Sequence, residues 1–367
     1  MDLSAGSRPL YAEIIAAIEK VITNSDFIGG EEVAAFENEF AAFAGRKHAV
    51  ACGNGTDALI IALKALGIGP GDTVVTVPNT FIATAEAVTA VGAGVAFVDI
   101  EEEYYTIDPE KLRRLLEANK DKRIKAVIPV HLYGQMADME KIFRIAKEYK
   151  LKVIEDAAQA HGALLNGKSS GAFSDAATYS FYPGKNLGAF GDAGAVVTDN
   201  ADLSARIKKL SNHGRVKKYE HEFEGYNSRL DAIQAAVLRI KLRHLKKGNE
   251  SRINKAERYT KLLSEDKSII CPQVRNGAKH VFHLYVVQVS NRDEVRLSLK
   301  EKVITTGIHY PLPLHLQPAY KYLGYHQGSF PIAEEAAKKI LSLPLWPEMS
   351  LQAIEYVCST LLRLRGD

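Results

Sequence analysis

Cysteine is scarce in this chain, and the three that occur, Cys52, Cys271 and Cys358, lie far apart. Their spacing matches neither the paired cysteines of a zinc site nor the dense pattern of a disulfide framework. The scarcity excludes small disulfide-stabilised folds. We expect a protein that works in the reducing environment of the cytoplasm.

Long apolar runs are also missing. No segment approaches the length that spans a bilayer. The first twenty residues carry Asp2, Arg8, Glu13 and Glu19, so they lack the apolar core of a signal peptide. We therefore expect neither a membrane-spanning helix nor a secretion signal.

An excess of one charge is absent too, because 47 Lys and Arg residues stand against 44 Asp and Glu, a formal net charge of +3. So small a charge argues against nucleic acid or an anionic membrane as the main partner. The 367 residues are 46% hydrophobic and 25% charged, as in ordinary globular proteins. This length exceeds what a single core usually serves, so we expect two domains, or one large domain with a smaller appendage.

Short apolar runs alternate with helical patterns over the first two thirds of the chain. The predicted strands are residues 48–52, 73–77, 94–98, 125–130, 151–154, 176–181 and 194–198. Strands this apolar are buried on both faces, which indicates a mostly parallel α/β sheet covered by helices. We predict a large domain over residues 1–240 and a smaller α+β domain over residues 241–367. Ligands of such sheets bind at the carboxyl ends of the strands.

The first predicted strand runs into Gly53-Asn-Gly-Thr56 and then into a helix. The free N–H groups at a helix start bind anions, and Gly55 would let a phosphate approach the backbone while Thr56 donates its hydroxyl. The alternative is that Thr56 only caps the helix.

Lys185 follows another predicted strand, on the turn Pro183-Gly-Lys185. A lysine that is partly desolvated has a lowered ammonium pKa, and its amine can then attack a carbonyl. The alternative is an ordinary solvated lysine.

Two further strand ends carry polar or aromatic candidates. Asp156 could pair with a protonated ring nitrogen, and Gln159 could reach an oxygen of the same ligand. The alternative for Asp156 is the N-cap of a helix over residues 157–161. Phe81 could stack on an aromatic ring or belong to the core. In the Pro-rich segment near the C-terminus, His309 and His315 suggest substrate contact or loop packing rather than metal binding.

Six motifs in this order resemble the DegT/DnrJ/EryC1/StrS family of pyridoxal-phosphate-dependent nucleotide-sugar aminotransferases. They are Asn54-Gly-Thr-Asp-Ala-Leu59, Pro78-Asn-Thr-Phe-Ile-Ala-Thr84, Glu155-Asp-Ala-Ala-Gln-Ala-His-Gly162, Ser180-Phe-Tyr-Pro-Gly-Lys-Asn-Leu-Gly188, Gly225-Tyr-Asn-Ser-Arg-Leu230 and Tyr310-Pro-Leu-Pro-Leu-His315. The similarity runs from about Phe27 to the C-terminus. It implies an aspartate-aminotransferase-like fold (fold type I) and a homodimer with the active site at the subunit interface.

The resemblance also implies roles for individual residues. Lys185 would bind pyridoxal 5'-phosphate as a Schiff base and later move the proton, with pyridoxamine phosphate as the alternate cofactor form. Around the ring, Asp156 would hold the pyridinium nitrogen, Gln159 the ring hydroxyl and Phe81 the ring face. The implied phosphate ligands are Gly55, Thr56, Ser180 and the partner subunit's Asn227, and the implied substrate contacts are Arg229, Tyr310 and His315.

The implied reaction moves an amino group from glutamate to a keto-sugar nucleotide. The motifs are most similar to those of enzymes that aminate C3 of a dTDP-3-keto-6-deoxyhexose to give a dTDP-3-amino-3,6-dideoxyhexose. Amination at C4 of a dTDP- or UDP-4-keto-6-deoxyhexose stays open as an alternative. So does a regulatory protein that binds a sugar nucleotide without catalysis, although such a protein needs neither Lys185 nor Asp156.

Overall fold

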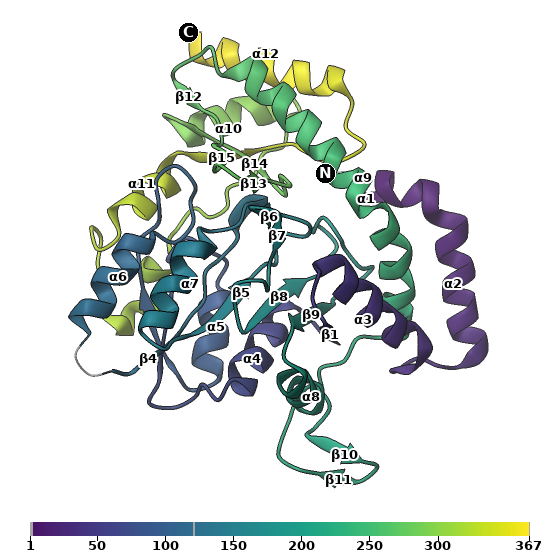
Figure 1. Cartoon of the computed structure of the whole chain (residues 1–367). Helices are drawn as coiled ribbons and strands as arrows, with labels where there is room; N and C mark the ends of the chain where they lie inside the picture. The colour runs from purple at the N-terminus through teal and green to yellow at the C-terminus, as the bar shows by residue number, and fades with distance from the viewer. Residues whose placement is uncertain (1–2, 120–121, 367) are drawn as a thin grey trace.

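The computed structural model describes residues 3–119 and 122–366, and its centre is a seven-stranded sheet (Figure 1). The strands lie in the order β1-β9-β8-β5-β4-β2-β3. Their bounds are β1 (His48–Cys52), β2 (Thr73–Thr76), β3 (Gly94–Phe97), β4 (Ile124–Val127), β5 (Lys152–Asp156), β8 (Ala176–Ser180) and β9 (Gly194–Thr198). Each lies where an apolar run predicts a strand.

Most of the sheet is parallel, which confirms the predicted α/β class. The pairs β2–β3, β2–β4, β4–β5 and β5–β8 are parallel, whereas β9 runs antiparallel to both β8 and β1. Because β9 returns directly beside β8, residues 181–193 form a loop at the carboxyl end of β8. This loop carries Lys185, and it thereby lies at the ligand-binding edge of the sheet.

Helices cover the large sheet, and several begin at an Asn or Asp side chain that caps the first turn. Asn54, Asp108, Asp138 and Asn200 cap the helices that begin at Gly55, Pro109, Met139 and Ala201. The helix bounds are α3 (Gly30–Ala44), α4 (Gly55–Ala65), α5 (Ala83–Ala90), α6 (Pro109–Ala118), α7 (Met139–Glu148) and α8 (Ala201–Leu210), with the 3-10 turn η2 (Leu132–Gly134) between β4 and α7. α4 packs against β5, β8 and β9, so its first turn lies beside the carboxyl end of β8.

A second, smaller core lies around an antiparallel sheet of β12 (Ile269–Ile270), β14 (Tyr285–Val289) and β15 (Ile340–Leu343). It also takes in α10 (Arg292–Glu301), α12 (Leu351–Gly366) and the second half of α9 (Ala232–Leu263). Between these elements, η3 (Leu314–Leu316), η4 (Pro318–Leu323) and α11 (Pro331–Lys339) return to the large core. The division at residue 240 falls inside α9, which contributes to both cores, and it stays a prediction.

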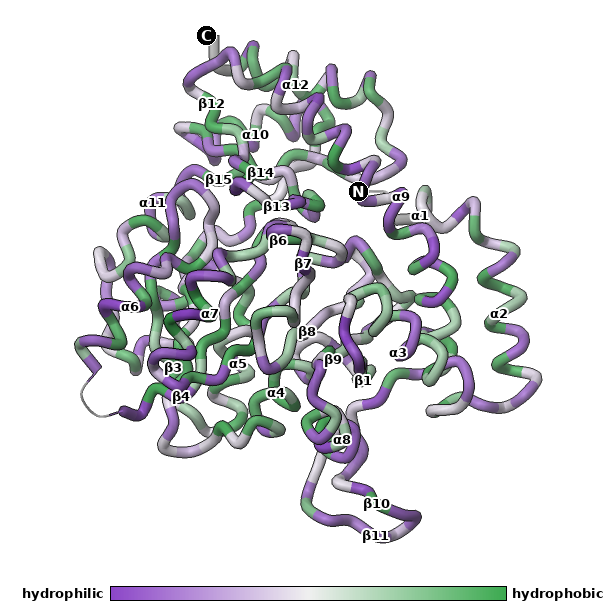
Figure 2. The backbone as a smooth tube through the Cα atoms, in the orientation of Figure 1, coloured by the Kyte–Doolittle hydropathy of each residue, from purple (hydrophilic) through white to green (hydrophobic). Residues whose placement is uncertain are grey.

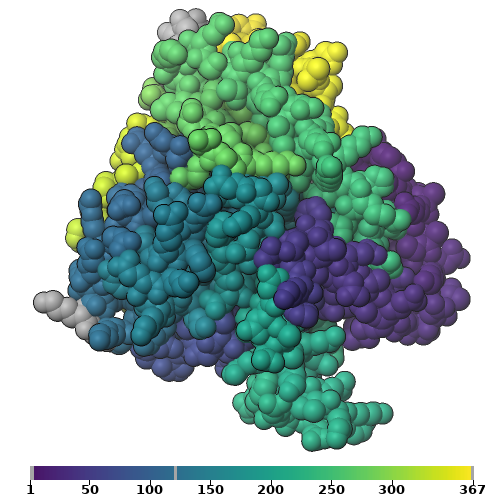
Figure 3. All heavy atoms as spheres, viewed as in Figure 1, coloured from purple at the N-terminus to yellow at the C-terminus, as the bar shows by residue number. Residues whose placement is uncertain are grey.

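The remaining elements lie at the periphery. α1 (Leu3–Ser7), η1 (Arg8–Leu10) and α2 (Tyr11–Asn24) precede α3, and α2 packs along α9. A small sheet joins β6 (Leu164–Leu165), β7 (Lys168–Ser169) and β13 (Ala278–Lys279). The hairpin β10 (Arg215–Lys217) and β11 (Glu220–His221) projects from the body of the molecule (Figure 3) and is mostly hydrophilic (Figure 2).

Among residues 3–119 and 122–366, no helix has both the length and the apolar character that crossing a membrane requires.

Candidate active site

The glycine turn after β1 forms the start of α4, as the sequence predicts. The helix cap is Asn54, whose side-chain oxygen accepts a hydrogen bond from the Asp57 amide at 2.8 Å. The alternative that Thr56 caps the helix is therefore wrong, and Thr56 lies in the first turn instead. A helix start beside a glycine is a suitable anion site.

Gly55 lies so close to β8 that any side chain would collide with it. A Cβ atom built on Gly55 would lie 2.6 Å from the Cβ of Ser180. Gly55 and Ser180, two of the predicted phosphate ligands, thus lie so close together that a methyl group on Gly55 would overlap Ser180.

We expect Gly55→Ala to weaken binding of pyridoxal phosphate by about 10-fold or more, because the loop must shift to admit the methyl group. Equilibrium titration of the cofactor-free protein measures this. The control is Gly69→Ala, whose added Cβ meets only ordinary contacts at 3.7 Å. Equal affinity of the Gly55→Ala and native proteins would contradict the proposed phosphate site.

Lys185 lies on a tight turn, in which its backbone amide donates a hydrogen bond to the Tyr182 carbonyl at 2.8 Å. The loop is then closed by the Ala189 amide, which donates to the Phe181 carbonyl at 2.7 Å. Burial lowers the pKa of the Lys185 ammonium, and the Asp156 carboxylate opposes this only in part. The lowered pKa is the direction that the sequence predicts.

This shift has a measurable consequence in the cofactor-free protein. The fraction of Lys185 present as the free amine should rise with pH through a midpoint below 10.5, the ordinary lysine value. The rate at which added pyridoxal phosphate develops visible absorbance should follow the same curve, since only the free amine attacks a carbonyl. A midpoint at or above 10.5 would contradict the buried setting of this lysine.

Asp156 ends β5 and is 6% exposed. Its Oδ2 accepts a hydrogen bond from Thr84 Oγ1 at 2.8 Å, and its Oδ1 accepts one from the Ala158 amide at 3.2 Å. Residues 157–161 form a turn rather than a helix, so the alternative that Asp156 caps a helix is wrong. The carboxylate is held in place by these two donors.

Gln159 is oriented by the backbone of the 3-10 turn η2. Its Oε1 accepts from the Tyr133 amide at 2.7 Å, and its Nε2 donates to the Tyr310 hydroxyl at 3.3 Å. Tyr133 adopts a left-handed backbone conformation, with φ of 60°, at the position where its amide meets Gln159. This links Gln159 to the Pro-rich loop that carries Tyr310.

Phe81 is 55% exposed, and its ring centroid lies 5.9 Å from that of Tyr310. The alternative that Phe81 belongs to the core is therefore wrong. Burial raises the pKa of the Tyr310 hydroxyl, and the nearby Asp156 carboxylate adds to the effect. Phe81 and Gln159 thus lie beside Tyr310. The Asp156 carboxylate lies near both Tyr310 and Lys185.

Three of the predicted site residues pair with residues outside the group described so far. Asn227 is exposed, and its backbone bridges to Asn212. Arg229 donates to the side-chain oxygen of the same Asn212 at 3.1 Å. His315 is only 1% exposed, and its Nε2 lies 3.0 Å from a Glu334 carboxylate oxygen, so its packing role is clear from the structure. The contact of Asn227 with the cofactor phosphate of the partner subunit and the contacts of Arg229 and His315 with a substrate stay predictions.

Two residues that hold site residues in place are not predicted from the sequence. Thr84 holds Asp156, and Tyr133 holds Gln159. Thr84 stands in the same motif as Phe81, but its bond to Asp156 joins residues of two distant segments, which no local spacing indicates. Nothing local indicates Tyr133, because its contribution comes from a backbone amide.

The residues present fit pyridoxal phosphate. A glycine-lined helix start suits its phosphate, a lysine with a lowered pKa suits its aldehyde, and a fixed carboxylate suits its ring nitrogen.

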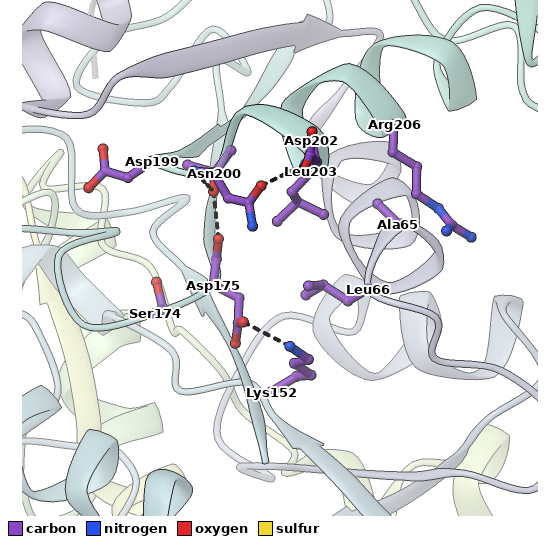
Figure 4. Close-up of a pocket in the computed structure, with 11 residues that line it drawn as sticks. Ala65, Leu66, Lys152, Ser174, Asp175, Asp199, Asn200, Asp202, Leu203 and Arg206 are labelled. Atoms are coloured by element: carbon purple, nitrogen blue, oxygen red, sulfur yellow. Dashed lines mark hydrogen bonds and ion pairs between the residues drawn. The ribbon is translucent and has the colours of Figure 1, made fainter. Parts of the chain in front are cut away.

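A hollow of about 600 Å³ lies elsewhere on the sheet (Figure 4). Its lining includes Lys152 at the start of β5, Asp175 just before β8, and Leu66 just after α4. The candidate site takes the opposite ends of these same elements, namely Asp156, Ser180 and Gly55. The hollow therefore faces away from Lys185, and the chemistry described above does not take place in it.

Comparison with known proteins identifies the family. Residues 9–362 match the DegT/DnrJ/EryC1/StrS aminotransferase family. The chain is 47% identical over 359 residues to a "Pleiotropic regulatory protein" of Geobacillus stearothermophilus, covering 97% of this chain and 95% of that protein. It is 44% identical over 363 residues to the dTDP-3-amino-3,6-dideoxy-alpha-D-galactopyranose transaminase of Aneurinibacillus thermoaerophilus, covering 99% and 98%.

A solved structure shows the same fold. The crystal structure of DesV from S. venezuelae in complex with a ketimine intermediate superposes with a TM-score of 0.96 at 43% identity, covering 99% of this chain and 97% of that one. This similarity confirms the predicted fold type I. The sequence match and the structural similarity together show that the chain belongs to the DegT/DnrJ/EryC1/StrS aminotransferase family and is an enzyme that depends on pyridoxal phosphate.

Proposed function

We propose that the enzyme transfers an amino group from glutamate to C3 of a dTDP-3-keto-6-deoxyhexose, which gives a dTDP-3-amino-3,6-dideoxyhexose. The observation that carries the proposal is that Lys185, whose pKa is lowered by burial, lies near the fixed carboxylate of Asp156. The relative from A. thermoaerophilus, named for a 3-amino-3,6-dideoxy sugar on dTDP, supports the choice of substrate.

Bound pyridoxal phosphate supplies an electron sink that takes the amino group from a donor and passes it to a carbonyl acceptor. Lys185 would hold the cofactor through its Nζ amine, and the same amine would remove and return a proton at the substrate carbon. Asp156 would keep the ring nitrogen protonated, because its carboxylate is fixed by Thr84 and by the Ala158 amide.

The other residues would bind and orient. Gln159 would reach the ring hydroxyl through the amide that now donates to Tyr310, and Phe81 would cover the ring face. The amides at the start of α4, with Thr56 and Ser180, would hold the phosphate.

We further propose that two copies of the chain share each site. Apolar side chains are exposed along α2, among them Tyr11, Ile15 and Ile22, where a monomer would leave them in water. Phe190, in the loop that carries Lys185, is also exposed. Asn227 is exposed, which suits its proposed contact with the cofactor of the partner.

The substrate would enter beside the Pro-rich loop. Tyr310 of this loop bonds Gln159, whereas His315 would act through packing in the present conformation. Arg229 would meet an anionic group of donor or nucleotide. We place this chemistry in the cytoplasm, and the three cysteines, all unpaired, support that assignment.

A regulatory protein is the second candidate, and the name of the relative from G. stearothermophilus favours it. A protein that only binds a sugar nucleotide has no use for a buried lysine beside a fixed carboxylate. Lys185 and Asp156 therefore favour the enzyme.

The test is incubation of the purified protein with glutamate and, separately, dTDP- and UDP-linked 3-keto and 4-keto sugars, followed by NMR to locate the new amine. We expect an amine at C3 of the dTDP-3-keto-6-deoxyhexose. An amine at C4 would replace the proposed substrate by the alternative. Tight binding of a sugar nucleotide with no amine formed from any of them would favour the regulatory candidate.

A further inference from the structure

One face of α9 follows the loop that carries Lys185. Three of its side chains each bond one residue of that loop: Gln234 accepts from the Phe190 amide at 2.8 Å, Lys241 donates to the Gly188 carbonyl, and Asn249 accepts from the Asn186 side chain at 2.9 Å. The three α9 residues are seven and eight positions apart, about two helical turns each, so they share a face. The loop of residues 181–193, the lysine loop, is thus hydrogen-bonded to α9 at every second residue from 186 to 190.

Asn249 makes a second bond that the other two α9 residues do not. Its Nδ2 donates to the His161 carbonyl at 2.7 Å. His161 ends the same turn that begins at Asp156 and carries Gln159. A single buried amide, 3% exposed, therefore joins the segment of Lys185 to the segment of Asp156.

Asn186, next to Lys185, is held from several sides. Its Nδ2 also approaches the Val281 carbonyl at 3.3 Å, and its Oδ1 accepts from His283 Nδ1 at 3.1 Å. Val281 and His283 precede β14 in the chain. Because each polar atom of the Asn186 side chain has a partner, its position and that of the adjoining lysine backbone are closely defined.

We propose that Asn249 and Asn186 are positioning residues that set the separation between Lys185 and Asp156. This inference rests on the proposed function. Lys185 must reach the aldehyde carbon of the cofactor while Asp156 reaches the ring nitrogen, so one rigid ring has to satisfy both residues at once. A displacement of about 1 Å can cost about 100-fold in rate, so the two segments need a direct connection.

The experiment compares Asn249→Ala, Asn186→Ala and the double variant with the native protein. The first measurement is the rate at which added pyridoxal phosphate develops visible absorbance in the cofactor-free proteins. We expect each single variant to be slower by about 10- to 100-fold. The double variant should be about as slow as either single one, because both substitutions break the same connection.

The second measurement separates positioning from folding. The kcat of each variant should fall while its KM for glutamate changes little, and Asn249→Asp, which still accepts from Asn186, should regain part of the rate. Thermal unfolding of every variant is recorded beside these rates. Lys247→Ala is the control, since Lys247 lies on α9 two residues away with its side chain exposed.

The outcomes distinguish this inference from the function on which it rests. If the native protein develops no absorbance, the proposed function fails. If the native protein does so and the variants match its rate, or differ only in thermal stability, the positioning role is refuted. Rate losses that multiply in the double variant would also refute it, because Asn249 and Asn186 would then act separately. If the alanine variants do not fold, Asn249→Asp takes their place; it should be slower than the native protein because it loses the donor to the His161 carbonyl, and a native rate would refute the positioning role.

Discussion

Replacing Lys185 with alanine is expected to give a protein that carries no visible absorbance from covalently bound cofactor and has no measurable turnover. The remaining residues would still bind the phosphate and the ring, because Gly55, Ser180 and Asp156 are unchanged. What is lost is the amine with the lowered pKa that attacks the aldehyde and moves the proton. Absorbance spectra of the variant and the native protein, before and after glutamate, measure the effect.

Lys241 provides a matched control for this result. It is another partly buried lysine, and burial lowers its pKa to about 8. Its Nζ, however, donates to the Gly188 carbonyl and lies 5.3 Å from the centre of the Phe190 ring. We expect Lys241→Ala to retain the visible absorbance. Absorbance that survives in Lys185→Ala and disappears in Lys241→Ala would move the reacting lysine to position 241.

The second large effect is expected at Asp156. Asp156→Asn keeps the shape of the side chain and an oxygen for Thr84 or Ala158, but it removes the negative charge that would keep the ring nitrogen protonated. We expect the cofactor to bind and turnover to fall by about 100-fold or more, the scale of losing one charge contact with the reacting group. Single-turnover loss of absorbance with glutamate measures this step alone.

Asp175→Asn is the control for charge removal. Asp175 lies just before β8, at the opposite end of the sheet, and its carboxylate is held by Lys152 and the Val153 amide. Its substitution should leave the single-turnover rate near the native value. Near-native turnover of Asp156→Asn would show that this carboxylate does not face the ring nitrogen.

The features that depend on a local sequence pattern are predicted well from the sequence. The seven strands lie at the apolar runs, and Lys185, Asp156 and Ser180 lie at carboxyl ends of strands, because burial on both faces produces continuous apolar segments. The mostly parallel arrangement follows from the alternation of strands and helices.

What depends on distant pairing is not predictable in this way. The antiparallel course of β9, which brings the lysine loop to the sheet edge, is decided by pairing with β8 and β1. Asn54 rather than Thr56 caps α4, although both are good capping residues, because the helix begins at Gly55, two residues earlier than a Thr56 cap would require. The burial of His315 against Glu334 joins residues nineteen positions apart.

The roles of Thr84, Tyr133 and Asn249 appear only in three dimensions. Each bonds a residue in another segment, and for Tyr133 the bonding group is a backbone amide that its side chain does not reveal. Residue type therefore indicates which side chains would contact the cofactor. The residues that hold those side chains in place can be identified only from the folded structure.

The most direct test of the account is to reduce the native protein with borohydride in the presence of pyridoxal phosphate and to locate the modified peptide by mass spectrometry. Reduction converts the bond between a lysine and the aldehyde carbon into a stable amine. We expect the reduced native protein to carry one phosphopyridoxyl group for each chain, attached to Lys185. Attachment to a different lysine, or no attachment at all, would contradict it.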